Sequence, residues 1–403
     1  MKCLYKNIPI ALVLILIAGC SIYHEEINID VQNYENLSPS TIETSLKVVN
    51  LVVDQKEFDH MYSTVNEEVE IEGRFNLYRN GKVLIEDELV ELELKGTFSV
   101  KFPLKSLGVK FDKTYDNSSR KLIDPDNLPF HDLDKIKAFR LRNSGNDFKF
   151  TLLKDMSLTQ MAIEAGLDLD LSYSEQTVVF VNNSFLGLMN LRTESNANGM
   201  SRLYDVGKSR ITLAKIVKDG IIEKKDGDFE RIDQFFNAIN EKDYDYLNEE
   251  IDTENFIDYM IYQSYIGNID WPHNNVRLFS VDDAPFRFVL FDLDLAILHK
   301  INSPPQKFIN SSTDNPITDL FNLFYENEEF KADYDTRYEQ LIESNLLDSK
   351  KFEAIVEQYK DNIKHLIPTQ IEKHGFPKSM TEWLIDIERV KSNFSQRKKA
   401  LKK

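Results

Sequence analysis

The chain has 403 residues and a formal net charge of −18 at neutral pH. So acidic a surface repels nucleic acid phosphates, and neither DNA nor RNA is expected as a partner. The only cysteines are Cys3 and Cys20, and Cys3 lies in a segment that we expect to be removed. No internal disulfide can then form, so the fold must depend on its hydrophobic core. The length suits one two-lobed domain or two domains.

The first residues have the pattern of an export signal. Lys2 and Lys6 precede the apolar stretch 8–17, which is too short to span a bilayer as a stable helix. It ends in Ile17-Ala18-Gly19-Cys20, which resembles the bacterial lipobox. That resemblance implies that residues 1–19 are a signal peptide and that Cys20 carries lipid. An ordinary secretory signal and a short membrane anchor are the alternatives. We predict an exported, membrane-anchored lipoprotein of the cell envelope, in the outer membrane if the host is Gram-negative.

Residues 20–43 are polar and without periodicity, and we expect a tether. Residues 44–195 carry mainly strand signals, and Asn80-Gly81 and Asn182-Asn183 predict two tight hairpins. Predicted strands are Leu46–Val53, Glu70–Tyr78, Lys82–Lys95, Val109–Phe111, Ile136–Leu141, Gln176–Val181 and Phe185–Leu191. Helices are predicted at 55–62 and from a cap at Asp147 to Gly166.

Residues 196–403 carry long helical patterns. Predicted helices are Phe229–Asn240, Phe256–Ile266, Tyr334–Ser344, Phe352–Leu366 and Thr381–Leu401, and the only strands predicted here are Val276–Ser280 and Phe286–Phe291. A β-rich N-lobe (44–195) and a mainly helical C-lobe (196–403) with one small hairpin predict an α+β, two-lobed protein-kinase-like fold.

Two acidic stretches in the C-lobe stand out as a candidate site. Asp270 follows a helix that Gly267 can end, and Asn275 directly precedes a strand. An Asp and an Asn at this spacing, between a helix and a strand, are typical of the kinase catalytic loop. The alternative is a pair of turn residues that cap the strand.

Asp292 and Asp294 emerge at the end of the apolar strand Phe288–Phe291. Residues two apart share a face of an extended chain, and two carboxylates on one face repel unless a cation or a proton lies between them. Oxygen ligands suit Mg²⁺ or Mn²⁺ better than Zn²⁺. The alternative is one salt-bridged aspartate and one helix cap.

Phosphate groups also need positive partners, and the segment 95–105 is the best candidate. Gly96 lets backbone N–H groups approach a ligand, and Lys105 can reach phosphates as a point charge. Neither the usual kinase glycine loop nor a Walker A loop is present. The alternative is a surface turn with solvated lysines.

Motifs spread over residues 45–300 resemble the CotH kinase family, which is named for a spore-coat protein and includes bacterial lipoproteins and fungal surface proteins. They are Lys105-Ser106-Leu107-Gly108-Val109-Lys110-Phe111; Leu141-Arg142-Asn143 with Asp147 and Lys154-Asp155; Val181-Asn182-Asn183-Ser184-Phe185-Leu186-Gly187-Leu188 with Glu194; Asn268-Ile269-Asp270-Trp271 with Asn275; and Asp292-Leu293-Asp294. The chain departs from the family at Leu107-Gly108, where Tyr-Arg is usual, and at Lys95-Gly96, where Arg-Gly is usual.

The resemblance implies an ATP-dependent kinase that uses Mg²⁺ or Mn²⁺. Asp270 would be the catalytic residue, and Asn275 and Asp292 would bind the metal with support from Asp294. The implied nucleotide contacts are Lys105, Gly96 and Glu194, with Asp147 or Asp155 as the acidic partner of Lys105.

Three functions remain open on the sequence. The first is phosphoryl transfer to a Ser or Thr hydroxyl of a surface or coat protein, or of the chain itself. The second is a non-catalytic surface, coat-assembly or adhesion module that retains the fold. The third is a metal-dependent enzyme that acts on another hydroxyl, such as that of a polysaccharide.

Overall fold

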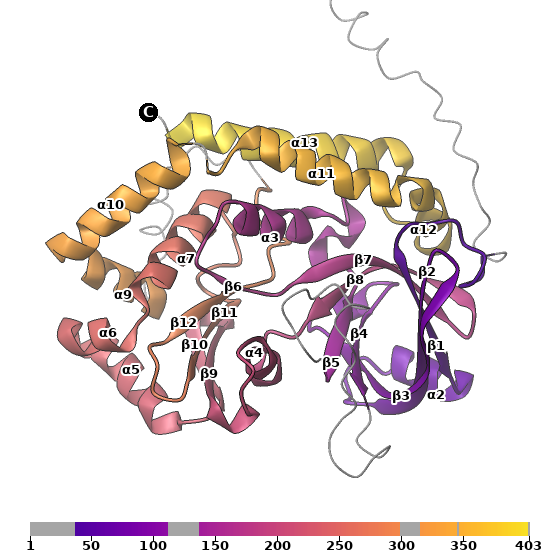
Figure 1. Cartoon of the computed structure of the whole chain (residues 1–403), viewed down its shortest axis with the longest axis horizontal. Coiled ribbons are helices and arrows are strands. Elements are labelled where there is room, and N and C mark those ends of the chain that lie inside the picture. The colour runs from indigo at the N-terminus through magenta and orange to yellow at the C-terminus, as the bar shows by residue number, and fades with distance from the viewer. Residues whose placement is uncertain (1–36, 112–136, 299–314, 345, 402–403) are drawn as a thin grey trace, which may run out of the picture.

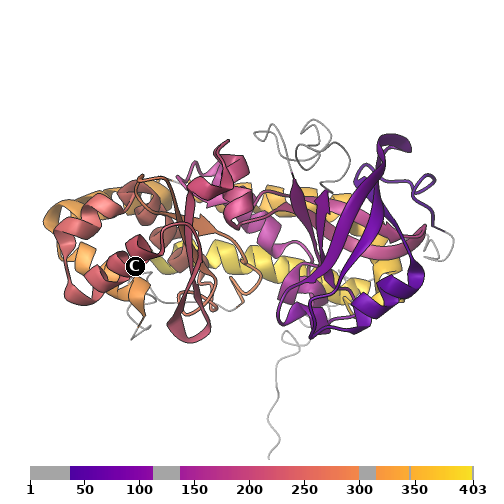
Figure 2. The same ribbon diagram turned by 90° about the horizontal axis from the view of Figure 1, so that it is seen from below.

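The structure is a computed structural model that describes residues 37–111, 137–298, 315–344 and 346–401 (Figure 1). The predicted signal peptide, the lipidation site Cys20 and most of the predicted tether lie outside the described residues. Figure 2 shows two bodies side by side, a barrel formed early in the chain and a second sheet with helices around it.

The barrel is closed, with strand order β1-β2-β3-β4-β5-β8-β7. Its strands are β1 (Lys47–Val53), β2 (Glu70–Arg79), β3 (Lys82–Lys95), β4 (Ser106–Phe111), β5 (Ala138–Arg142), β7 (Ser174–Val181) and β8 (Ser184–Thr193). The parallel pairing of β1 with β7 closes it. Both hairpins and all seven predicted strands are therefore confirmed, six of the strands within about two residues. Strand β4 begins three residues before the predicted Val109.

Alternation along the strands determines what fills the barrel. Phe75, Phe111 and Phe139 are fully buried and contact one another, with ring centroids 5.4 to 5.8 Å apart. On β5 the buried residues Phe139 and Leu141 alternate with Arg140 and Arg142, whose side chains lie on the outer face of the barrel. One face of β5 therefore packs into the barrel core, and the other presents two arginines to the elements outside the barrel.

One helix begins later than predicted. Asp147 does act as a cap, because its carboxylate accepts the backbone N–H groups of Thr151, Leu153 and Lys154. However, a short 3₁₀ turn (Gly145–Lys149) comes first, and α3 spans Lys154–Glu164. The left-handed backbone of Ser144, with φ of 68°, and of Leu152, with φ of 66°, delays the helix.

The second sheet has the order β10-β9-β11-β12-β6. Its strands are β6 (Asp170–Leu171), β9 (Ile211–Val217), β10 (Ile221–Asp226), β11 (Val276–Val281) and β12 (Arg287–Leu290). The prediction of a single small hairpin in this half was therefore wrong. Strands β9 and β10 were missed because Lys215 interrupts the apolar run of β9, and because β10 is largely exposed and polar.

Helices surround this sheet and extend over both bodies. They are α4 (Ala197–Leu203), α5 (Phe229–Glu241), α6 (Tyr244–Glu250), α7 (Thr253–Ile266), α9 (Pro316–Tyr325), α10 (Glu328–Ile342), α11 (Ser349–Ile363), α12 (Ile367–His374) and α13 (Met380–Leu401), while α2 (Gln55–Ser63) lies on the barrel. Helix α11 packs on α3 and α13, and α13 also contacts α7. Across the described ranges, no helix is both long and apolar enough to cross a membrane. The mixed α and β content is confirmed, whereas the kinase-like arrangement of lobes and the domain limits stay predictions.

Candidate active site

The Asp270 loop begins where α7 ends. Gly267 adopts a left-handed conformation, with φ of 57°, and its N–H donates to Gln263 O, which stops the helix. The buried Asn268 side chain then donates to Gln263 Oε1 at 3.3 Å and to the Asp292 carbonyl at 3.5 Å. One amide side chain therefore joins the Asp270 loop to the end of β12, so the two acidic stretches lie next to each other.

Asp270 is a half-buried hydrogen-bond acceptor. Its Oδ2 accepts the side-chain N–H groups of Asn275 at 2.8 Å and of Asn274 at 3.2 Å. Burial raises the pKa of Asp270, the negative charge of Asp292 raises it further, and the asparagine hydrogen bonds oppose the rise. The two asparagines therefore fix the position of Asp270 Oδ2, and the raised pKa makes the Asp270 carboxylate more basic than that of an exposed aspartate.

Asp292 and Asp294 differ sharply in their surroundings. The Asp294 side chain is only 4% exposed, whereas that of Asp292 is 27% exposed. Arg142 donates to both carboxylates, to Asp294 Oδ2 at 2.8 Å and through a shorter contact to Asp292 Oδ1. Asp294 also accepts the backbone and side-chain N–H groups of Asn146 at 2.9 and 3.2 Å. Desolvation and the neighbouring Asp292 nevertheless raise the pKa of Asp294 to about 7.

A buried ionic chain connects these aspartates to α3 and to the barrel. Arg142 Nε lies 3.5 Å from Asp155 Oδ2, and Arg192 of β8 donates to the same oxygen at 2.7 Å. The arginine charges outweigh the cost of burial and lower the pKa of Asp155. Lys154 on the same helix donates to the Asp294 carbonyl at 2.9 Å. Elements of both bodies are therefore joined at the site.

The oxygen atoms at the site are compatible with binding of a hard divalent cation. Among the described residues, Asn275 Oδ1 and Asp292 Oδ2 receive no hydrogen bond in the structure, and both are oxygens of the kind that Mg²⁺ prefers. Both residues also adopt left-handed backbone, with φ of 57° and 60°, a conformation that Asn and Asp adopt more readily than other side chains and that is common at functional sites. In the same described ranges no three His, Cys, Asp or Glu side chains form a metal-binding group, so most ligands would be water or phosphate.

The predicted nucleotide contacts are more dispersed. Lys105 Nζ donates to Phe102 O at 2.8 Å and lies 5.1 Å from the centre of the Tyr62 ring. Neither of its suggested acidic partners contacts it, because Asp147 lies by Lys154 and Asp155 pairs with arginines. That suggestion was wrong.

The other two predicted contacts have clear local roles. Gly96 has a φ of 111°, and a Cβ at this position would lie 2.4 Å from Ser99 Oγ, so the turn requires glycine. Glu194 accepts from Arg140 at 3.2 Å and from Asn196 at 2.9 Å. These contacts do not test whether Gly96 and Glu194 bind a nucleotide, so that role stays a prediction for both residues.

No role was predicted for the basic residues of the site, namely Arg142, Arg192 and Lys154, although Arg142 and Lys154 lie in the family motifs. A weak signal existed, because Arg140 and Arg142 alternate with apolar residues in a short strand that otherwise faces a core. Nothing local indicates that this outer face meets the acidic loops, since the contacts span 150 and 152 positions of sequence.

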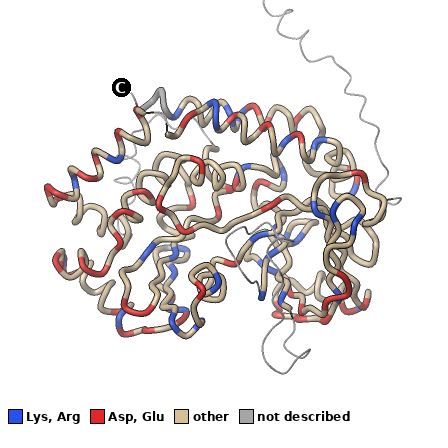
Figure 3. Tube along the Cα trace, in the orientation of Figure 1, with Lys and Arg blue, Asp and Glu red and all other residues tan. Residues whose placement is uncertain are grey.

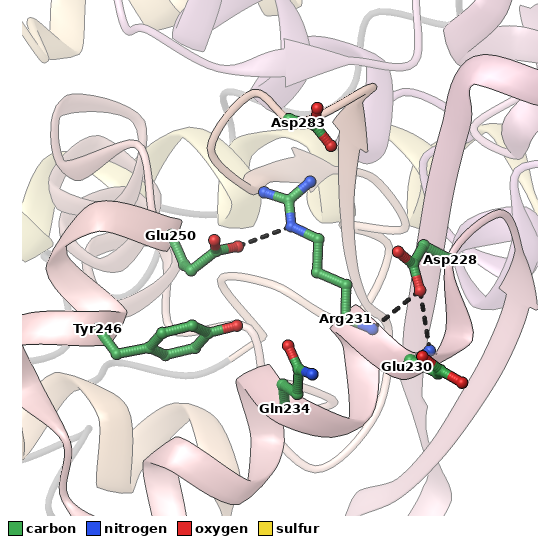
Figure 4. Close-up of a pocket in the computed structure, with 7 residues that line it drawn as sticks. All are labelled: Asp228, Glu230, Arg231, Gln234, Tyr246, Glu250 and Asp283. Atoms are coloured by element: carbon green, nitrogen blue, oxygen red, sulfur yellow. Dashed lines mark hydrogen bonds and ion pairs between the residues drawn. The ribbon is translucent and has the colours of Figure 1, made fainter.

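A separate hollow of about 370 Å³ lies beside α5 and α6 (Figure 4). Its central cation, Arg231, pairs with Glu250 at 2.7 Å and donates to Ser280 Oγ and to the carbonyls of Asp282 and Ala284. The guanidinium therefore joins α5 to the β11–β12 turn and retains little capacity for a ligand.

The fold and the site together define a mixed α and β protein in which one arginine of the barrel, Arg142, contacts both aspartates that follow β12 and an aspartate of α3. Residues 92–401 match the family model described as CotH kinase protein, and the chain belongs to this family. No curated protein sequence matches it. One solved structure, described as that of the Helicobacter pylori proinflammatory kinase CtkA, is similar over 78% of this chain and 94% of that chain. It has 11% sequence identity and a TM-score of 0.28, so this likeness establishes neither fold nor activity here.

Proposed function

We propose that the chain is an exported, lipid-anchored atypical kinase that transfers the γ-phosphoryl group of ATP to a Ser or Thr hydroxyl of a surface or coat protein, or of itself. In this proposal the barrel corresponds to the N-lobe of a kinase, and the second sheet with its helices corresponds to the C-lobe. Membership of the CotH kinase family supports kinase-like chemistry. The observation that carries the site assignment is the joining of the Asp270 loop to Asp292 through Asn268.

Asp270 is proposed to accept the proton of the acceptor hydroxyl as its oxygen attacks the γ-phosphorus. The bond between that phosphorus and the bridging oxygen breaks, and ADP leaves. The raised pKa of Asp270 suits a proton acceptor, and Asn275 fixes the orientation of its carboxylate. Asn275 and Asp292 would hold Mg²⁺ or Mn²⁺, which neutralises charge on the phosphates when bound. Arg142 holds the aspartates in position.

The test combines a binding and a transfer measurement. ATP with Mn²⁺ should raise the melting temperature of the parent, and Asp292→Asn should abolish the rise. Transfer of radiolabel from γ-labelled ATP, to the chain or to envelope proteins, should fall about 100-fold or more in Asp270→Asn because a general base is lost. Asp282→Asn, which removes one partner of an exposed ion pair with Arg210, is the matched control.

Two outcomes would contradict the proposal. Equal labelling by Asp270→Asn and the parent would remove Asp270 from catalysis. No response to any combination of nucleotide and metal would favour the non-catalytic surface module. The anchor is tested separately, because a fatty-acid probe should label the parent and not Cys20→Ala.

A further inference from the structure

Two cations lie side by side on the second sheet, beside the acidic loops. Lys215 of β9 and Arg277 of β11 are direct cross-strand partners, whose Cβ atoms lie about 5 Å apart in such a ladder. They share a face with Leu213 and Phe279, which pack with α4 further along the strands. The Arg277 guanidinium stacks on Phe291, the residue before Asp292, at 4.1 Å from the ring centre.

The barrel brings further positive charge to the same place. Arg140 and Arg192 are direct partners across β5 and β8. Arg277 Nη1 donates to the Ser195 carbonyl at 2.9 Å, and Ser195 follows Glu194, the ion-pair partner of Arg140. Figure 3 shows basic positions on the strands of both bodies. Cations from two sheets therefore converge where the sheets meet.

Among the described residues, the carboxylates that pair with these cations are Glu194 with Arg140 and Asp155 with Arg192. Glu223, the neighbour of Lys215 on β10, pairs instead with Lys225 at 2.6 Å. Within the described ranges, neither Lys215 nor Arg277 takes part in an ion pair. Buried N–H groups also lack acceptors there: Nε of Arg140, Nε of Arg277, and both Nε and Nη2 of Arg192, a residue only 4% exposed.

Such an arrangement is costly without a ligand. Buried cations require a counter-charge, and buried N–H donors require acceptors. Desolvation, reinforced by the charge of Arg277, lowers the pKa of Lys215 to about 8. The ligand-free protein holds positive charge in an unfavourable state that an anion would relieve.

We propose that Arg140, Lys215 and Arg277 form an anion subsite that takes the phosphate groups of the nucleotide that are not transferred. This inference rests on the proposed function, because that function supplies a ligand whose transferred phosphoryl lies at the acidic loops. Arginine offers a planar fork of donors and lysine offers a compact charge, a combination suited to phosphate oxygens. The subsite replaces Lys105 as the main phosphate contact.

The test measures binding of inorganic tripolyphosphate by calorimetry at pH 7, without a divalent cation or nucleoside. Lys215→Met should weaken binding about tenfold or more, because one charge-assisted contact is lost. The same variant should melt at the same temperature as the ligand-free parent or higher, since a repelled cation is removed. Lys208→Met, which removes an exposed lysine paired with Asp226, should bind tripolyphosphate as the parent does.

The pH dependence provides a second readout. The groups that face Lys215 are Arg277, Arg140, Lys225 and Glu223. With a pKa of about 8, Lys215 is mostly charged at pH 7 and mostly neutral at pH 9. The ratio of parent affinity to Lys215→Met affinity should therefore fall as the pH rises over this window.

Unchanged binding in both Lys215→Met and Lys215→Glu would overturn the subsite, as would equally tight binding of citrate to the parent. If tripolyphosphate binding depends on Lys215 while no phosphoryl transfer is detectable, the subsite stands and the proposed kinase activity fails. If phosphoryl transfer is normal and tripolyphosphate binding does not depend on Lys215, the proposed kinase activity stands and the subsite fails.

Discussion

Replacement of Arg142 by Met should reveal what holds the candidate site together. The Arg142 side chain is only 11% exposed, and it contacts Asp292, Asp294 and Asp155. Removal of one partner from a buried ionic network typically costs about 3–5 kcal/mol, because the charges left behind are uncompensated. Asp155 keeps Arg192 as a partner, so most of the loss should come from the two aspartates that follow β12. We expect a loss near the lower end of that range.

The loss should depend on pH. Because the pKa of Asp294 in the folded protein, about 7, lies above its unfolded value, the folded state binds more protons and its stability falls as the pH rises toward 7. Without Arg142 this pKa moves higher, so the deficit deepens at pH 8 and shrinks at pH 5.5. Mn²⁺ should restore part of the stability of the variant at pH 8, by about 2.7 kcal/mol at a hundredfold excess over its dissociation constant.

Urea unfolding of the parent and Arg142→Met at both pH values, with and without Mn²⁺, measures these effects. Arg210→Met is the control, because it breaks an Arg–Asp pair in which both side chains are about half exposed, and it should cost less than about 1 kcal/mol. A deficit below about 1 kcal/mol in Arg142→Met at pH 8, or one that is the same at pH 5.5, would refute the reasoning.

Two further predictions concern residues around this site and the helix that covers the barrel. A Cβ on Gly145 would lie 1.8 Å from Asp294 Oδ2, whereas one on Gly166 would meet nothing within 4 Å, and both glycines have positive φ. Chemical denaturation should therefore show a loss of about 1 kcal/mol for Gly166→Ala and distinctly more for Gly145→Ala; equal losses would contradict the close approach. Burial lowers the pKa of His374 to about 4, while its Nε2 lies 2.7 Å from the Leu186 carbonyl. Because the unfolded chain binds this proton first, stability should drop by about 2–3 kcal/mol between pH 6.5 and 4, and His374→Gln should flatten this slope; an unchanged slope would exclude His374 as its source.

Local sequence signals predicted the elements that local chemistry determines. Asn80-Gly81 and Asn182-Asn183 adopt the positive φ values that tight hairpin turns require. Gly267 ends α7 as expected, and the polar residues around it place Asp270 in a loop. The acidic half of the site was predictable because its members fall within a short span of sequence and each follows a regular element.

The basic half was not predictable, because long-range packing creates it. Arg142 shows only alternation along β5, and its partners are set by how the barrel meets the second sheet. Strand β9 was missed for a related reason. Lys215 breaks its apolar run, and the structure shows that this lysine lies opposite Arg277. Departures from the expected pattern therefore occur at the residues that carry the proposed binding role.

The end of α13 makes the Asp270 loop depend on a distant part of the chain. Arg397 is only 1% exposed, and its guanidinium donates to the carbonyls of Ser264 and Tyr265 in the last turn of α7. These carbonyls lack helical partners, and the arginine caps them just before the loop begins. A proteolytic cut or a bulky fusion that displaces α13 would remove this cap. We therefore expect it to disturb the Asp270 loop and to reduce activity at the candidate site. Assays of shortened forms should keep residues 380–401 intact.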